Sequence, residues 1–207
     1  MAYILIFITA IFVNNIVLSQ FLGICPFLGV SKKVDTAVGM SAAVVFVLTL
    51  STIVTYLLQK YVLVRFDLVY LQTIAFILVI AALVQMVEII IKKISPSLYQ
   101  ALGVYLPLIT TNCCILGVAI LVANGTFNAQ GMDHNLLTGV VYAISTAIGY
   151  GLALILFAAI REQLALVNIP KGMQGMSIAL ITAGLMAMAF MGFSGVDKGL
   201  AILFGLN

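Results

Sequence analysis

Hydrophobic residues run along the whole chain in long stretches that contain no charged residue. The charged residues separate six such stretches, which are residues 1–31, 36–59, 68–87, 94–132, 135–160 and 172–196. Each stretch can supply the about 20 apolar residues that a helix needs to cross a bilayer. Strands are not expected, because an open strand leaves its backbone groups unpaired in lipid and the short alternating segments of a membrane barrel are absent. The pattern predicts an all-α integral membrane protein with six transmembrane helices in a single membrane domain, residues 1–207.

The composition excludes a soluble domain. Of the 207 residues, 64% are hydrophobic and only 7% are charged, and the mean hydropathy is +1.29. A soluble domain carries about 25% charged residues, so this chain could not cover its surface against water. The net charge of +3 is small and scattered, which predicts no nucleic-acid partner. The first stretch lacks a basic start, so we expect a retained span rather than a cleaved signal peptide.

The basic residues predict the orientation in the membrane. The connections after the first, third and fifth stretches hold six of the nine, which are Lys32, Lys33, Lys92, Lys93, Arg161 and Lys171. The other side collects Lys60, Arg65 and Lys198. By the positive-inside rule the side with six basic residues is cytoplasmic. Both termini are therefore expected on the non-cytoplasmic side.

The first and fourth stretches are longer than a straight span requires, with 31 and 39 residues against about 20. Both also contain helix-breaking residues, which are Gly23, Pro26 and Gly29 in the first and Gly103, Pro107 and Gly117 in the second. Proline removes a backbone donor and clashes with the preceding turn. A broken helix is tolerated at membrane depth where protein or a cavity surrounds it. Helices 1 and 4 are therefore predicted to be discontinuous.

The same motif occurs in both long stretches. Cys-x-x-Leu-Gly-Val spans residues 25–30 and again residues 113–118, so that Cys25 and Cys113 are 88 residues apart. Each motif belongs to a half with three spans, about residues 1–93 and 94–207. Because three is odd, the second half starts from the opposite side of the membrane, as in two inverted three-helix repeats. The alternative is that both cysteines are small buried hydrophobic residues.

Two thiolates near the midplane could form a disulfide, bind a soft metal or hold part of an iron–sulfur cluster. A cluster normally takes four cysteines and a structural zinc ion four ligands. The single histidine, His134, is far in sequence from both cysteines. One chain therefore supplies two ligands, and a second, similar chain is the simplest source of the other two. Cys114 follows Cys113 and would point about 100° away on a helix, so we assign it to packing.

Several other polar residues lie in or beside the apolar stretches. Glu88 precedes Lys92 by four residues, which favours an ion pair at the membrane interface over a proton or cation site. Thr111 and Asn112 precede Cys113 and are candidates to support the backbone near Pro107 or to donate hydrogen bonds to a cluster sulfur. The sequence shows no nucleotide-binding loop, catalytic triad or histidine pair, so we name no catalytic residue.

Longer motifs around the cysteines resemble those of a known family. Residues 21–33, which contain Cys25, resemble the first signature of the RnfA/NqrE family, and residues 106–113, which end at Cys113, resemble the second. Further similarity lies at residues 159–162 and 179–195. Five positions favour the RnfA branch, which belongs to the Rnf electron transport complex, over the NqrE branch: Asn14, Asn15, Pro26, Gly29 and Thr111.

The resemblance implies a core membrane component of an ion-translocating oxidoreductase, a translocase of the cell (inner) membrane with no complete active site in this chain. Such a complex passes electrons between ferredoxin and NAD and couples them to Na⁺ or H⁺ transport. The resemblance also implies that Cys25 and Cys113 bind the iron of a [2Fe–2S] cluster shared with an RnfE-like paralogue, beside the B, C, D and G components of the complex.

Three alternatives stay open. The chain could be the equivalent NqrE component of the Na⁺-translocating NADH:quinone reductase. It could instead be a non-redox inverted-repeat transporter, which would bind a solute or ion and no iron. A purely structural component with inert cysteines is the third.

Overall fold

The computed structural model describes residues 2–31, 33–94, 106–125, 135–167 and 175–196, together with 199 and 202. Within these ranges the chain is helical and contains no strand. The elements, in chain order, are α1 (Ala2–Ile8), the π-helical turn η1 (Thr9–Val13), α2 (Ile24–Val30), α3 (Val34–Leu58), the π-helical turn η2 (Gln59–Leu63), the short 3₁₀ helix η3 (Val69–Leu71), α4 (Gln72–Ile94), α6 (Leu106–Thr110), α7 (Cys113–Ala123), α8 (Leu136–Ala165) and α9 (Met176–Met191).

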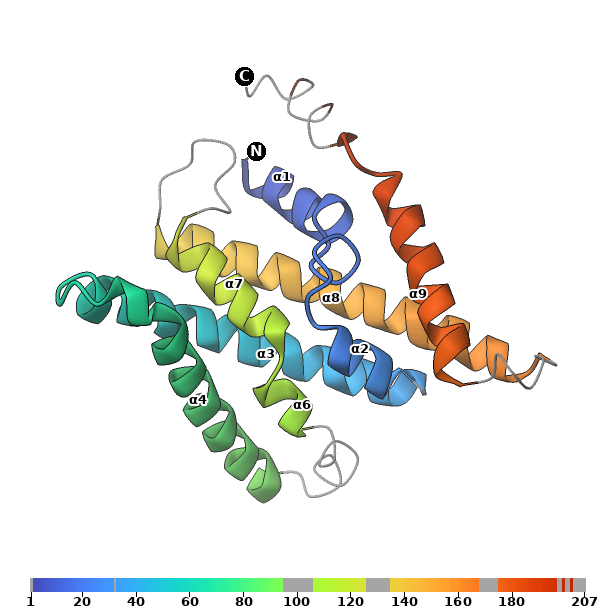
Figure 1. Cartoon of the computed structure of the whole chain (residues 1–207), viewed down its shortest axis with the longest axis horizontal. Helices are drawn as coiled ribbons and strands as arrows, with labels where there is room; N and C mark the ends of the chain where they lie inside the picture. The colour runs from blue at the N-terminus through green and yellow to red at the C-terminus, as the bar shows by residue number, and fades with distance from the viewer. Residues whose placement is uncertain are drawn as a thin grey trace.

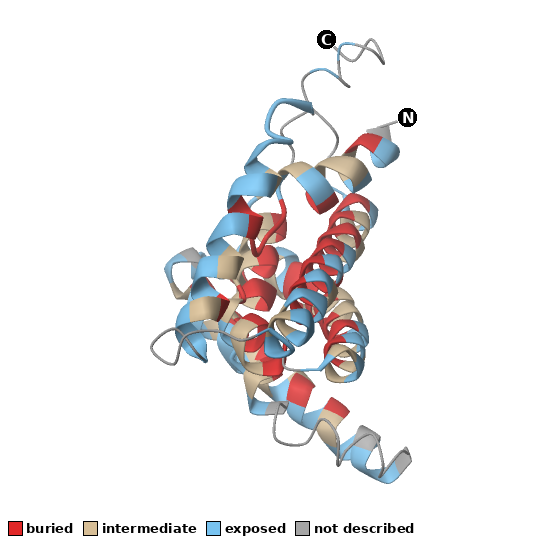
Figure 2. Ribbon diagram, turned by 90° about the vertical axis from the view of Figure 1, so that its right-hand side faces the viewer, coloured by how far each residue is buried: buried red, intermediate tan, exposed pale blue. Residues whose placement is uncertain are grey.

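The long helices α3 and α8 lie side by side and form the centre of the bundle (Figure 1). Their facing sides carry fully buried side chains such as Met40, Val44 and Tyr150. Small residues let the two helices approach closely, since a Cβ added at Gly151 would lie only 3.1 Å from Cβ of Ser41. Such small residues are typical of helix contacts in membranes. The buried residues gather inside the bundle in Figure 2.

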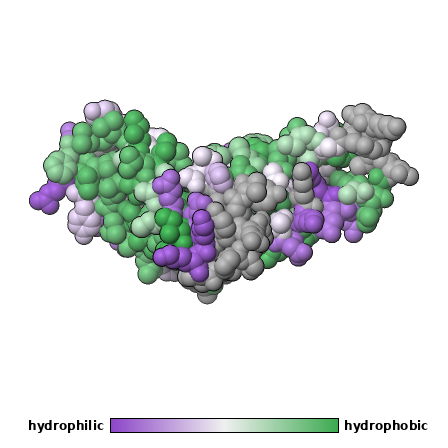
Figure 3. Space-filling view, turned by 90° about the horizontal axis from the view of Figure 1, so that it is seen from below, coloured by the Kyte–Doolittle hydropathy of each residue, from purple (hydrophilic) through white to green (hydrophobic). Residues whose placement is uncertain are grey.

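Three helices are long and apolar enough to cross a membrane: residues 34–63, which are α3 and η2, residues 72–90 of α4, and α8. Shorter apolar helices cover residues 3–13, 107–123 and 176–191. Only 22% of the α4 span is buried, against 61% of the α8 span, so α4 lies at the periphery. Hydrophobic residues dominate much of the described surface in Figure 3, as a lipid-facing surface requires.

The first apolar stretch is interrupted between η1 and α2, over residues 14–23. Gly23 ends the interruption in the left-handed region with φ +81°. Pro26 does not cause the break; it lies in the first turn of α2, where its missing N–H would have no helical partner anyway. Gly29 lies inside α2. Two of the three residues that we expected to break this helix are therefore helical.

The second interruption is shorter and separates α6 from α7 at residues 111–112. Pro107 is the second residue of α6, again in a first turn. Gly117 lies inside α7, where it makes room for Leu22: a Cβ added there would lie 2.7 Å from Leu22 Cδ1. Gly103 lies outside the described residues.

Asn15 satisfies the backbone of the first interruption. Its side chain is fully buried, and its Nδ2 donates to the carbonyls of Ile11 (3.0 Å) and Gly149 (2.9 Å). Its Oδ1 accepts from the N–H groups of Val17 (3.1 Å) and Leu18 (3.4 Å). These bonds replace those that a continuous helix would make, as a non-helical segment at membrane depth requires. They also fix the segment to the middle of α8.

Candidate functional site

The two interrupted segments, far apart in sequence, meet at Gly23. Its backbone N–H donates to Sγ of Cys113 at 2.9 Å. A Cβ added at Gly23 would lie 3.0 Å from Cβ of Cys114 and 3.2 Å from Oδ1 of Asn112. This position has room only for a glycine. The segment leading into Cys25 is thereby held against the segment that carries Cys113.

The three cysteines lie in three different environments. Cys25 is the second residue of α2 and is exposed, whereas Cys113 is the first residue of α7 and is partly buried. Cys114 is fully buried in the hydrophobic core, as its assignment to packing predicts. Cys113 lies in the first turn of α7, where the helix dipole favours negative charge on sulfur.

Asn112 and Thr111 have different roles beside Cys113. Asn112 is buried and caps α7, with its Oδ1 accepting from the N–H of Cys114 at 3.1 Å. Among the described residues its Nδ2 has no hydrogen-bond partner. Thr111 is exposed, and its hydroxyl donates to the carbonyl of Pro107 at 2.9 Å. Thr111 therefore supports the backbone of α6, whereas Asn112 keeps a free buried donor.

Two residues of α8 belong to this region although the sequence did not indicate them. Tyr150 is fully buried between the two interrupted segments, with its ring close to Gly23 and to all three cysteines. Arg161 donates from Nη1 to the carbonyl of Leu28 (2.8 Å) and to Oγ of Ser31 (2.9 Å). Arg161 thus ties the C-terminal end of α2, the helix with Cys25, to α8.

Stacked aromatic rings support the Arg161 contact. Phe27 of α2 stacks on Phe157 of α8, with ring centroids 4.4 Å apart, and the Arg161 guanidinium lies 5.9 Å from the centroid of Phe157. A cation near an aromatic face contributes about 0.5–2 kcal/mol. No sequence motif predicts these contacts, because they join positions about 130 residues apart.

The chemistry of the described residues suits half of a metal centre. These residues contain no cluster of three or more His, Cys, Asp or Glu side chains that could hold a metal ion. His134 lies outside them. Two cysteines beside a free backbone donor and a buried amide donor match thiolate ligation with hydrogen bonds to sulfur. The remaining ligands would have to come from another chain.

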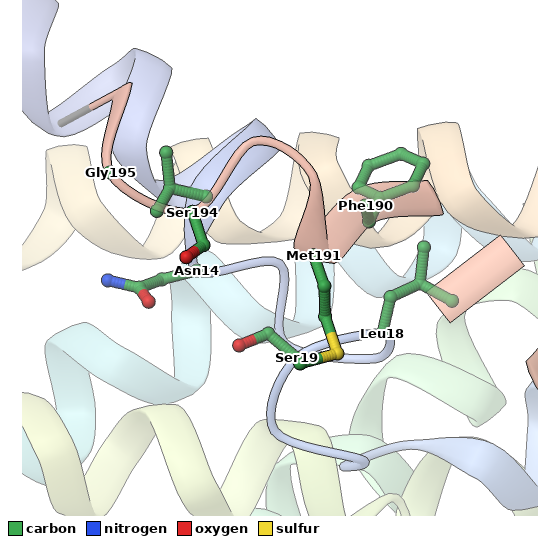
Figure 4. A pocket seen from close by; sticks show the side chains of 8 residues that line it. Asn14, Leu18, Ser19, Phe190, Met191, Ser194 and Gly195 are labelled. Carbon is green, nitrogen blue, oxygen red and sulfur yellow. The ribbon is translucent and has the colours of Figure 1, made fainter. Parts of the chain in front are cut away.

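A separate cavity of about 360 Å³ lies beside the first interruption and the end of α9 (Figure 4). Asn14, Ser19 and Ser194 are its polar lining residues, and Phe190 and Met191 are among the apolar ones. No cysteine lines it. Glu88 is partly buried on α4 and does not line it either. The cavity is therefore distinct from the cysteine region.

The family model described as Rnf-Nqr subunit, membrane protein, matches residues 3–197. The chain belongs to this family. Membership covers both interrupted segments and all six predicted hydrophobic stretches, so the cysteine region is part of the family's common core. It also confirms that this all-helical chain is a membrane protein.

Similar family members are all described as the A component of redox complexes. The chain is 59% identical to that of the Na⁺-translocating ferredoxin:NAD⁺ oxidoreductase complex of Acetobacterium woodii, over 96% of this chain and 100% of that protein. It is 56% identical to that of the ion-translocating oxidoreductase complex of Alcanivorax borkumensis, over 95% and 98% of the two chains. The corresponding protein of Pseudoalteromonas translucida is 54% identical over the same shares.

Proposed function

We propose that this chain is the RnfA component of an Rnf-type ion-translocating ferredoxin:NAD⁺ oxidoreductase in the cell membrane. The names of its relatives support the complex and its coupling to ion transport. Within that complex, Cys25 and Cys113 are two ligands of a [2Fe–2S] cluster, and an RnfE-like paralogue supplies the other two. The B, C, D and G components complete the complex.

The observation that carries the cluster proposal is the hydrogen bond from Gly23 to Cys113 Sγ. It brings the start of α2, with Cys25, to the start of α7, and it places a backbone donor on a ligand sulfur. The exposure of Cys25 supports a shared centre, because a ligand at the surface can meet ligands of a second chain. A complete site within one chain would instead bury all of its ligands.

The cluster would supply one-electron transfer, and the residues of this chain would hold and shield it. Cys25 and Cys113 bind iron through their sulfur atoms. Gly23 N–H stabilises negative charge on Cys113, and Arg161 holds the α2 end that follows Cys25. The apolar side chains around the two segments, among them Phe27 and Leu22, keep water away.

In this proposal the chain crosses the membrane six times as two inverted repeats, with both termini on the non-cytoplasmic side. The three shorter apolar helices supply, with flanking residues, the spans that complete α3, α4 and α8. A reporter enzyme fused after Asn207 is expected to report the non-cytoplasmic side, and one inserted beside Lys92 the cytoplasmic side. The reverse pattern would contradict the orientation.

The cluster is tested with three variants of the complex purified with its partner. Cys25→Ser and Cys113→Ser are each expected to abolish or greatly weaken the [2Fe–2S] EPR signal and to stop electron transfer. Cys114→Ala is the matched control and is expected to keep both, because Cys114 packs in the core. The chain expressed alone is expected to hold little iron.

Two outcomes would refute the cluster proposal. One is a full cluster bound by the chain alone as a monomer. The other is a native spectrum in Cys25→Ser with a lost spectrum in Cys114→Ala. Within the family, the NqrE component of the NADH:quinone reductase is the competing assignment, and the electron acceptor of the purified complex, NAD⁺ or quinone, distinguishes the two.

The cavity in Figure 4 favours a second function, that of a solute or ion transporter without iron. Its polar lining lies at a helix interruption, where transporters commonly bind substrates. That function predicts transport that survives the loss of Cys25 and Cys113.

A further inference from the structure

Tyr150 lies where the two interrupted segments meet. Its side chain is fully buried in the middle of α8. The ring packs on Gly23 so closely that a Cβ added there would lie 2.9 Å from Tyr150 Cε2. The same point is 3.0 Å from Cys114 and 3.2 Å from Asn112. One tyrosine therefore contacts the segment before Cys25 and lies beside the segment around Cys113.

The neighbours of Tyr150 in α8 fix its place. Gly149 accepts the hydrogen bond from Asn15, and a Cβ added at Gly149 would lie 3.0 Å from Cα of Ile11. Gly151 packs against Ser41 of α3. Close contacts on both sides hold this turn of α8 in position, so the direction of the Tyr150 side chain is determined by the packing of the whole bundle.

Two buried polar atoms near Tyr150 lack a partner among the described residues: the hydroxyl of Tyr150 and Nδ2 of Asn112. The bond from Cys114 N–H to Oδ1 fixes the orientation of the Asn112 amide, so Nδ2 remains a donor. A buried polar group without a partner costs about 1–3 kcal/mol. Such groups are rare in native proteins and commonly mark an absent ion or a redox role.

We propose that the Tyr150 hydroxyl and the Asn112 amide donate hydrogen bonds to sulfur atoms of the metal centre at Cys25 and Cys113, and that Tyr150 thereby sets its reduction potential. This inference rests on the proposed cluster. Hydrogen bonds to the sulfurs are a principal means by which a protein sets a cluster potential. Reduction adds one negative charge, so buried donors stabilise the reduced form more than the oxidised form and raise the potential.

Tyr150→Phe separates this role from packing, because phenylalanine keeps the ring against Gly23 and removes only the hydroxyl. In the complex purified with its partner, the variant is expected to retain the [2Fe–2S] EPR signal at full amplitude. Its midpoint potential is expected to fall, so that the ratio of reduced to oxidised cluster at the wild-type midpoint drops by about tenfold, which is about 59 mV for a one-electron couple.

Tyr56→Phe is the matched control. Tyr56 is also buried, but it follows Ser41 by 15 residues along α3, which is roughly 22 Å at 1.5 Å per residue. Removing its hydroxyl is expected to leave the midpoint potential unchanged. A second measurement uses electron–nuclear double resonance in H₂O and D₂O, where Tyr150→Phe is expected to lose one exchangeable proton coupled to the reduced cluster.

An unchanged midpoint with unchanged proton couplings in Tyr150→Phe would overturn this inference. Loss of the cluster from an otherwise assembled Tyr150→Phe complex would also overturn it, because a tuning hydroxyl is not needed for iron to bind. Absence of any [2Fe–2S] signal from the wild-type complex is a different result, which would refute the proposed cluster itself.

Discussion

Replacing Gly23 with alanine tests whether the two interrupted segments approach as closely as the structure has them. Gly23 has φ +81°, and the left-handed region costs a residue with a Cβ about 1–2 kcal/mol. The new methyl group would lie 2.9 Å from Cε2 of Tyr150 and 3.0 Å from Cβ of Cys114. Overpacking of this kind costs about 1–3 kcal/mol. We expect Gly23→Ala to lower the free energy of unfolding by about 2–5 kcal/mol.

Two other glycines separate backbone strain from the steric contact. Gly175 also has a positive φ, +94°, but nothing lies within 4 Å of a Cβ added there. Gly175→Ala therefore carries the strain alone, about 1–3 kcal/mol. Gly184 lies within α9, and a Cβ added there also meets nothing within 4 Å. Gly184→Ala is expected to stabilise the protein by about 0.5–1 kcal/mol.

The assay is unfolding of the purified complex in detergent, together with the amplitude of the [2Fe–2S] EPR signal. Gly23→Ala is expected to be the least stable of the three variants. It is also expected to weaken the EPR signal, because the methyl group displaces the N–H that bonds Cys113. If Gly23→Ala costs no more than Gly175→Ala and keeps the full signal, the close approach of the two segments is refuted.

Two further predictions concern contacts that hold the interrupted segments. Arg161→Ala removes charged hydrogen bonds to the end of α2, so we expect a loss of about 1.5–3 kcal/mol in unfolding free energy, with Arg161→Lys intermediate. Equal stability of all three proteins would show that these bonds contribute nothing. Asn15→Leu leaves buried backbone groups unpaired and is expected to cost about 3 kcal/mol or more in thermal or denaturant unfolding. Asn14→Leu, at the exposed neighbouring position, is the control and is expected to change little.

The sequence predicted the class of the molecule because that depends on hydropathy alone. Long charge-free stretches require helices in lipid, and the structure and the family both agree with an all-helical membrane protein. The sequence also indicated the two regions of interruption, but it assigned the wrong residues to them. Pro26 and Pro107 suit first turns, so the breaks fall before Pro26, at Gly23, and after Pro107, at Asn112.

The parts of the site that the sequence did not predict are tertiary contacts. Tyr150 is one of eight tyrosines and belongs to no motif. Its position depends on the close packing of Gly149 and Gly151 against other segments. Arg161 lay within a matching family segment, but its bonds to α2 could not be inferred without the fold. Pattern periodicity describes neighbours within one helix, whereas these contacts join different helices.

The graded burial of the three thiols gives the free chain a chemical signature of assembly. Alkylating reagents react with accessible thiolates, so Cys25, which is exposed, is modified first, Cys113 more slowly, and the buried Cys114 only on unfolding. A partner that covers the surface of α2 removes the fastest reaction and leaves the core thiol unaffected. Alkylation kinetics followed by mass spectrometry therefore count assembled chains separately from unassembled and unfolded ones, whether or not iron is present.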